Sequence, residues 1–158
     1  MTHEHDTRSI EALVAAQKPG YALDQRFYTD PAIYELELER IIARNGLLAG
    51  HVSDRAEPGD FKVLAVARES AIIVRSKDGS IRAFANVCRH RGSLVCLEKR
   101  GNTRKFACPY HGWTYDTDGT LIAARSMPDG FDRSGYSLSP VSYGEIHGLM
   151  FVCFCDDP

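Results

Sequence analysis

The 158-residue sequence has no apolar run that approaches the roughly 20 residues of a membrane-spanning helix, so we expect no membrane segment. Its first 20 residues, MTHEHDTRSIEALVAAQKPG, contain acidic side chains and no long apolar stretch, which excludes a secretory signal and predicts a cytoplasmic location. Internal repeats and low-complexity tracts are also missing. The formal net charge is only −2 at pH 7, and this small negative total argues against a nucleic-acid partner.

Cysteine is scarce and its number is odd: there are five, which does not suit a framework of paired disulfides. Two of the cysteines stand beside histidines, an arrangement that favours metal binding. By contrast, 44% of the residues are hydrophobic and 25% are charged, so the chain has enough apolar side chains for a core. Its length is that of about one domain.

Residues 1–45 are predicted to form a helical segment in front of the main domain. Ser9 is expected to cap a short helix over residues 10–17. A stronger helix is predicted to begin at Asp30 and Pro31, with the aspartate as capping residue and the proline at the first helical position. Its stop is expected at Gly46.

Residues 46–158 are predicted to be mainly β. The segments FKVLAVA, SAIIVRS, IRAFANV and GLMFVCFC, at residues 61–67, 70–76, 81–87 and 148–155, have the composition of strands. A tight hairpin at Asp78 and Gly79 is expected to join the second of these strands to the third. Short strands separated by turns predict a small β-sandwich, preceded by the N-terminal helices.

Two short segments, NVCRHRGS at residues 86–93 and ACPYHGW at residues 107–113, each combine one cysteine with one histidine. The candidate metal ligands in them are Cys88, His90, Cys108 and His111. Each segment is expected to be a loop that follows a strand, because a rigid scaffold can hold such loops in position. Both loops run into a glycine, Gly92 or Gly112, which lets the backbone approach a bulky inorganic group.

Two kinds of metal site use two cysteines and two histidines. A structural zinc ion binds four such side chains in a tetrahedron, whereas a Rieske [2Fe–2S] cluster binds two cysteines on one iron and two histidines on the other. Zinc ligands usually come in like pairs, but here each loop supplies one of each kind. This distribution favours the two-iron cluster. The rival hypothesis is a zinc-stabilised binding module without redox activity.

The run CRHRG…CPYHGWTYDTDGTL resembles the N-terminal domain of the α subunit of Rieske non-haem iron oxygenases of the ring-hydroxylating type. The resemblance extends from about Phe27 to the C-terminus and includes the weaker matches GHVSD, AFANVC and MPDGFD. Together with SLVC after the first loop, these details look most like the oxygenases that act on quaternary ammonium compounds such as glycine betaine, proline betaine, carnitine and choline.

The resemblance implies a Rieske-type fold with cluster-binding loops. Cys88 and Cys108 would bind one iron as thiolates, and His90 and His111 would bind the outer iron through Nδ1. It also implies one-electron transfer from a ferredoxin or a flavin or iron–sulfur reductase to a mononuclear Fe(II). In the family this iron lies in a C-terminal catalytic domain, which is absent from this chain, of the same or a neighbouring α subunit in a trimer.

The chain alone is therefore not expected to oxygenate a substrate. We expect it to be the excised electron-entry domain of such an oxygenase. The alternative is a free-standing Rieske ferredoxin, whose gene would end near Pro158.

The two histidines leave the oxidised cluster core neutral, so it accepts an electron more easily than a four-cysteine cluster, at about −150 to +300 mV. Respiratory Rieske proteins have the two loop motifs C-x-H-x-G-C and C-P-C-H-G-S. In them a disulfide joins the loops, and a serine donates a hydrogen bond to a sulfide of the cluster. Here Ser93, Tyr110 and Trp113 stand at those positions. The resemblance therefore predicts no disulfide between the loops and a potential near the low end of the range.

The residues expected to support the ligands are Arg91, Gly92, Tyr110, Gly112 and Trp113. Trp113 is interpreted either as a lid over the cluster or as simple core packing. The six lysines and arginines between residues 89 and 105 either steer an acidic ferredoxin-like reductase or form only a solvated face. Cys96, Cys153 and Cys155 are expected to be small buried hydrophobic residues.

Overall fold

The structure, a computed structural model, describes residues 10–155. The chain consists of two compact units, with the division between Arg44 and Asn45. No helix in the described part of the chain is long and apolar enough to cross a membrane.

The first unit is helical. Residues 10–15 are helical, while Ser9, the cap predicted for them, lies outside the described residues. The other elements of this unit are α2 (Arg26–Thr29), α3 (Pro31–Arg40) and the 3₁₀ turn η1 (Ile42–Arg44). Helix α3 begins as predicted, because the Asp30 carboxylate accepts a hydrogen bond of 3.0 Å from the backbone N–H of Ala32.

The predicted end of this helix at Gly46 is wrong. Helix α3 ends at Arg40, and Ile41 is its C-terminal cap. Ile41 and Ile42 are two adjacent β-branched residues, which are less favourable in a helix than straight-chain ones. The chain tightens there into η1, where the Arg44 N–H donates to the Ile41 carbonyl.

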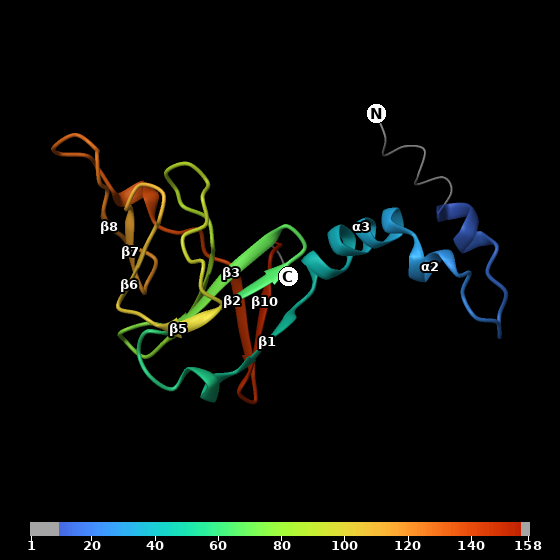
Figure 1. The fold of residues 1–158 in the computed structure, drawn as a ribbon. Coiled ribbons are helices and arrows are strands. Elements are labelled where there is room, and N and C mark those ends of the chain that lie inside the picture. Colours follow the sequence, from blue (N-terminus) through green and yellow to red (C-terminus); the bar gives the residue numbers. More distant parts are fainter. Residues whose placement is uncertain (1–9, 156–158) are drawn as a thin grey trace. The chain divides into compact units, whose positions relative to one another are not determined.

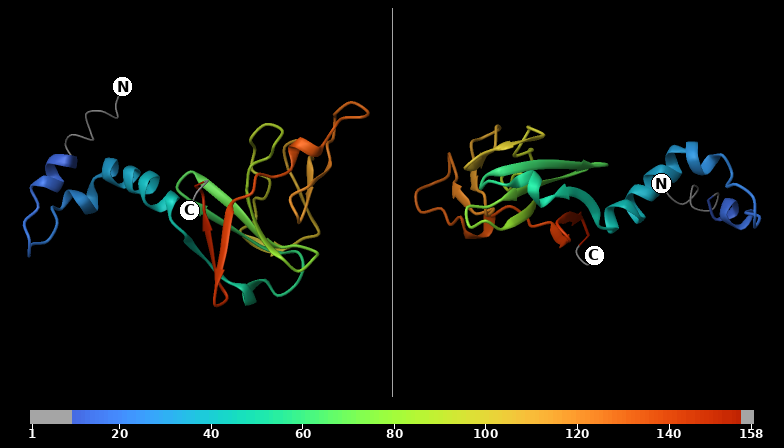
Figure 2. Two further views of the ribbon diagram at one scale, coloured as in Figure 1. Left: turned by 180° about the vertical axis from the view of Figure 1, so that it is seen from behind. Right: turned by 90° about the horizontal axis from the view of Figure 1, so that it is seen from below.

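The second unit is built from three small antiparallel sheets, in agreement with the prediction of a mainly β fold. The sheets have the orders β1-β10-β9, β4-β3-β2-β5 and β6-β7-β8. The elements are β1 (Leu47–His51), η2 (Val52–Arg55), β2 (Asp60–Val66), β3 (Glu69–Arg75), β4 (Ile81–Ala85), β5 (Arg100–Asn102), β6 (Lys105–Ala107), β7 (Thr114–Asp116), β8 (Leu121–Ala123), η3 (Ser134–Tyr136), β9 (Ser142–Ile146) and β10 (Leu149–Cys153). Figures 1 and 2 show the β2–β3 hairpin between the β6-β7-β8 sheet and the β1-β10-β9 sheet.

The four predicted strands correspond to β2, β3, β4 and β10, each within a few residues of its expected bounds. The hairpin at Asp78 and Gly79 is confirmed: β3 and β4 pair up to Arg75 opposite Ile81, and Gly79 has φ +84°. Glycine suits this turn because a positive φ carries no steric cost for it.

Strand β3 lies at the centre of the core, and its residues 71–74 are all buried. Ile72 belongs to a hydrophobic cluster that also contains Phe84 and both loop cysteines. Its neighbour Ile73 belongs to a second cluster that contains Met150. Because successive side chains of a strand point to opposite faces, β3 joins the two clusters. This double burial explains why its sequence is almost continuously apolar.

Candidate metal centre

Two loops of the second unit have the same backbone conformation, which is called the loop frame below: two equivalent hydrogen bonds and one glycine with positive φ. In the first loop, Cys88–Ser93, the Cys88 N–H donates to the Ser93 carbonyl at 2.8 Å, and the Gly92 N–H donates to the Cys88 carbonyl at 2.9 Å. In the second loop, Cys108–Trp113, the corresponding bonds join the same positions at 2.8 and 2.9 Å. Gly92 and Gly112 occupy the same place in the frame, with φ +73° and +70°. Both glycines therefore have a left-handed conformation that a residue with a Cβ rarely adopts.

The sheets position these loops differently. The first loop follows β4 and leads to β5, whereas the second closes the hairpin between β6 and β7. The β6–β7 pairing places Ala107 opposite Thr114 at the base of the second loop. Asn86 anchors the first loop: its buried amide accepts from the N–H groups of Val95 and Cys96 and donates to the Cys96 carbonyl. In the sequence, only the position of Asn86 two residues before Cys88 points to this anchoring role.

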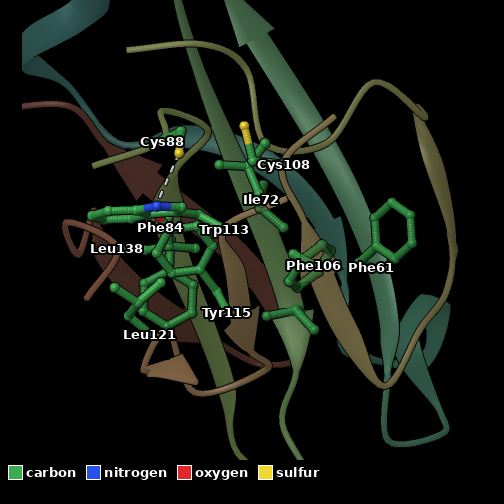
Figure 3. Close-up of a cluster of buried hydrophobic side chains, with 12 residues drawn as sticks. Phe61, Ile72, Phe84, Cys88, Phe106, Cys108, Trp113, Tyr115, Leu121 and Leu138 are labelled. Atoms are coloured by element: carbon green, nitrogen blue, oxygen red, sulfur yellow. Dashed lines mark hydrogen bonds between the residues drawn. The ribbon is translucent and has the colours of Figure 1, made fainter. Parts of the chain in front are cut away.

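The structure brings the candidate ligands of the two loops together in like pairs. Cys88 and Cys108 are both 3% exposed and lie at one edge of the same hydrophobic cluster (Figure 3). The rings of His90 and His111 lie edge to face, with centroids 4.8 Å apart and an interplanar angle of 73°.

Trp113 covers His90. The two rings are stacked, with centroids 4.8 Å apart and an interplanar angle of 12°. Trp113 is only 1% exposed, and Phe131 and Tyr136 pack against its other sides. The core interpretation of Trp113 is therefore confirmed, and its role as a lid over a cluster stays a prediction.

The surroundings of His90 suit a side chain that binds a metal. Its Nδ1 is buried and has no hydrogen-bond partner among the described residues. Burial lowers the pKa of His90 below its usual value, and the nearby His111 and Arg91 act in the same direction. A neutral imidazole with an unpartnered inward nitrogen is the form that binds a metal.

Tyr115, which lies in β7 two residues beyond Trp113, contacts the first loop directly. Its hydroxyl oxygen accepts a hydrogen bond of 3.0 Å from the Arg89 N–H and lies 3.3 Å from Cys88 Sγ (Figure 3). Burial, followed by the contact with Cys88, raises the pKa of Tyr115 well above its usual value. The hydroxyl therefore keeps its proton, and with Arg89 occupying the oxygen it can donate that proton to the Cys88 sulfur.

The remaining predicted support residues lie at the surface of the site. Tyr110 is 60% exposed, and its ring lies 3.8 Å from that of His111, measured between centroids. Arg91 is exposed, and no hydrogen bond of its side chain is found within residues 10–155.

The chemistry of the donor set fits a two-iron cluster. Each loop supplies one thiol and one imidazole, Cys88 with His90 and Cys108 with His111. A [2Fe–2S] cluster spreads its four ligands over two irons. The orphaned Nδ1 of His90 also agrees with ligation through that atom.

The fold and the site together define a class of small iron–sulfur domain, and comparison with known proteins places the chain in it. The family model of the Rieske [2Fe-2S] domain matches residues 47–131, and the chain belongs to this family. Its cofactor is accordingly a Rieske [2Fe–2S] cluster, and membership supports an electron-transfer role.

More particularly, the chain is similar to subunits of oxygenases. It is 37% identical over 153 residues, or 96% of its length, to the glycine betaine monooxygenase oxygenase subunit of Chromohalobacter salexigens, of which it covers 34%. It resembles naphthalene 1,2-dioxygenase from Rhodococcus sp. with a TM-score of 0.86 and 29% identity, over 100% of this chain and 37% of that one. It resembles the quaternary ammonium Rieske monooxygenase CntA in complex with L-carnitine with a TM-score of 0.75 and 35% identity, over 84% and 38%. The chain thus spans about a third of the length of the relatives it matches.

Proposed function

We propose that this chain is the electron-entry part of a Rieske oxygenase α subunit, in which Cys88 and Cys108 hold one iron and His90 and His111 hold the other. The observation that carries the proposal is the meeting of two Cys–His loops with one common frame around the unpartnered Nδ1 of His90. When bound, the cluster supplies a centre that accepts and releases one electron.

The surrounding residues prepare this centre. Trp113, stacked on His90, excludes water from one side of the imidazole. The Tyr115 hydroxyl is placed to donate to Cys88, and a donor to a cluster sulfur raises the reduction potential. Position 113 carries no hydroxyl, so we expect a potential toward the low end of the Rieske range.

The reductase is proposed to dock beside the first loop. All six basic residues between positions 89 and 105 are exposed. Next to them lies a cavity of about 380 Å³, with an apolar wall that includes Val95 and Phe106 and with Arg100 and Lys105 in its lining. Such a surface suits an acidic ferredoxin-like reductase or flavin reductase. Reduction of the chain by this partner should slow as ionic strength rises.

For the complete subunit we propose a catalytic domain with a mononuclear iron, assembly with neighbouring α subunits, a cytoplasmic location and a quaternary ammonium substrate. The similarity to the glycine betaine enzyme and to CntA supports this substrate class. The check is oxygen consumption by the full-length subunit with reductase: it should depend on glycine betaine or carnitine and not on naphthalene.

The ligand assignment is tested on the purified chain. Visible absorption, iron and sulfide content, and EPR before and after dithionite should show two irons per chain and a signal only after reduction. Cys108→Ser should lose the bound iron, and the matched control Cys96→Ser should keep it. A colourless, EPR-silent sample with one zinc per chain would overturn the electron-transfer proposal and leave the zinc-stabilised module.

A further inference from the structure

Two cysteines outside the metal centre lie in contact at the end of β10. Cys153 is the last residue of this strand, Cys155 follows two residues later, and their Sγ atoms are 3.0 Å apart. A disulfide bond is about 2.05 Å long, so the two sulfurs are within about 1 Å of bonding distance.

The contact depends on the end of the strand. The sequence predicts a strand that continues to residue 155. In a continuous strand, side chains two residues apart share a face, but their Cα atoms are separated by roughly 6.6 Å along the strand. Instead β10 ends at Cys153, and the chain bends at residues 154 and 155. Ser142 of β9 pairs with Cys153, and its hydroxyl donates to the Cys155 carbonyl at 3.4 Å.

The two thiols differ in exposure. Cys153 is 3% exposed and belongs to the buried core, whereas Cys155 is only half-buried. A reagent in solution therefore reaches Cys155 first. The buried Cys153 sulfur lies in contact with the Cys155 sulfur.

We propose that Cys153 and Cys155 form a reversible dithiol–disulfide pair that is oxidised by small disulfides such as glutathione disulfide. The Cys155 thiolate attacks one sulfur of glutathione disulfide, forms a mixed disulfide and releases one glutathione. Cys153 then attacks the Cys155 sulfur, forms the internal bond and releases the second glutathione. The protein loses two electrons and two protons, and the two glutathione molecules formed carry them.

The pair is independent of the proposed electron transfer, because it lies in the β1-β10-β9 sheet and uses none of the loop residues. The ring that it closes contains only three residues, so the disulfide adds little to the stability of the fold. Dithiothreitol in excess should reverse the reaction by thiol–disulfide exchange.

Trypsin makes the test direct. The last lysine or arginine of the chain is Arg133, so residues 134–158 form one peptide that contains both cysteines and no others. Cys96 lies in a separate peptide, residues 92–99, and serves as an internal control. It is partly exposed, its thiol donates a hydrogen bond to the Glu98 carbonyl, and burial raises the pKa of that thiol.

The cluster-loaded protein is incubated with glutathione disulfide, raised until Cys96 is glutathionylated, and the remaining thiols are trapped with N-ethylmaleimide. The 134–158 peptide should lose two hydrogens, carry neither maleimide nor glutathione, and regain two maleimide sites after dithiothreitol. A peptide that keeps two maleimides or accumulates glutathione, while Cys96 is modified, overturns the proposal.

Two variants separate the roles. In Cys153→Ser the reaction should stop at the mixed disulfide, so that Cys155 keeps its glutathione. In Cys155→Ser the buried Cys153 should take up maleimide only after denaturation. Equal glutathionylation in the two variants would contradict the order of attack.

Discussion

The two loops of the metal centre have the same backbone but unequal side chains. Both close with the same pair of hydrogen bonds and the same left-handed glycine. The first loop ends in Ser93, whose side chain bonds only to the neighbouring Leu94 carbonyl, while the second ends in the buried Trp113. Trp113 stacks on His90 of the other loop, and Tyr115, just beyond Trp113, contacts Cys88.

The support therefore runs mainly in one direction. The β6–β7 hairpin supplies the aromatic groups that hold the first loop, and the first loop supplies no equivalent side chain to Cys108. Cys108 Sγ donates a weak hydrogen bond of 4.0 Å to the backbone carbonyl of Leu94, the residue that follows the first loop. The four candidate ligands thus lie in loops with matching backbones, while the side chains that surround the two loops differ.

The largest effect is expected from Trp113→Ala, which should lower the free energy of unfolding by about 3–5 kcal/mol because it removes a fully buried indole. Urea unfolding measures the loss, and the bound iron should fall with it because His90 loses its cover. Ser93→Ala, at the equivalent position, should change stability by less than about 0.5 kcal/mol. Similar losses from both variants would refute the asymmetry.

A matched pair of glycine variants tests the common frame. Gly92→Ala and Gly112→Ala should each cost about 1–2 kcal/mol, because each forces a Cβ into a left-handed conformation. The new Cβ would meet nothing within 4 Å at Gly92 and only the flexible Arg125 side chain, at 3.5 Å, at Gly112. Thermal or urea unfolding should therefore give equal losses. A much larger loss at one glycine would show that the frames are not equivalent.

Local sequence patterns predicted the strands β2, β3, β4 and β10 and the start of α3, because hydrophobic periodicity and capping act over a few residues. They did not predict strands β5 to β8, each of three residues, which carry too little pattern and exist through pairing with neighbours. The end of α3 was missed because Gly46 is a good stop signal, whereas the actual end depends on Ile41 and Ile42.

The candidate site shows the same difference between features set by local sequence and features set by tertiary packing. The spacing of the two Cys–His segments was enough to select the candidate ligands, since each loop is local. The contact of Tyr115 with Cys88 joins positions 27 residues apart and depends on how the β6–β7 hairpin packs against the first loop. The stacking of Trp113 on His90 likewise depends on this tertiary packing, so the sequence left its role open between lid and core.

A smaller effect is expected from Tyr115→Phe, which removes one hydrogen bond and keeps the ring. Stability should fall by about 1 kcal/mol, and the reduction potential should become more negative because Cys88 loses a donor. Redox titration of the loaded protein measures this shift. The control is Tyr110→Phe, which removes the hydroxyl of an exposed ring in the second loop. This variant should leave the reduction potential unchanged. An unchanged potential in Tyr115→Phe would mean that the hydroxyl does not donate to the sulfur.

The smallest effect concerns the end of β7, where Asp116 joins the second loop's hairpin to the β3–β4 turn. Its carboxylate lies 2.6 Å from Lys77 Nζ, and this hydrogen bond holds the pKa of Asp116 below its usual value. A lowered pKa in the folded state gives stability that is fully present above the unfolded pKa of about 3.9 and is lost progressively as pH falls from there through the lower folded-state pKa. Because Lys77 is mostly exposed, the contribution should be less than about 1 kcal/mol.

Urea unfolding of the Lys77→Met and Asp116→Asn variants and of the double variant, at pH 7 and pH 3, should reveal a coupling that is smaller at pH 3 than at pH 7. Asp78 bonds to Ser80 and Arg82 within its own turn, so the matched cycle of Lys77→Met with Asp78→Asn should show none. Coupling of the same size at pH 3 and pH 7 would show that the link does not depend on the carboxylate charge. The β3–β4 turn would then be joined to the end of β7 by its neutral contacts, among them the buried hydrogen bond of 2.8 Å from the Ser76 hydroxyl to the Thr117 carbonyl.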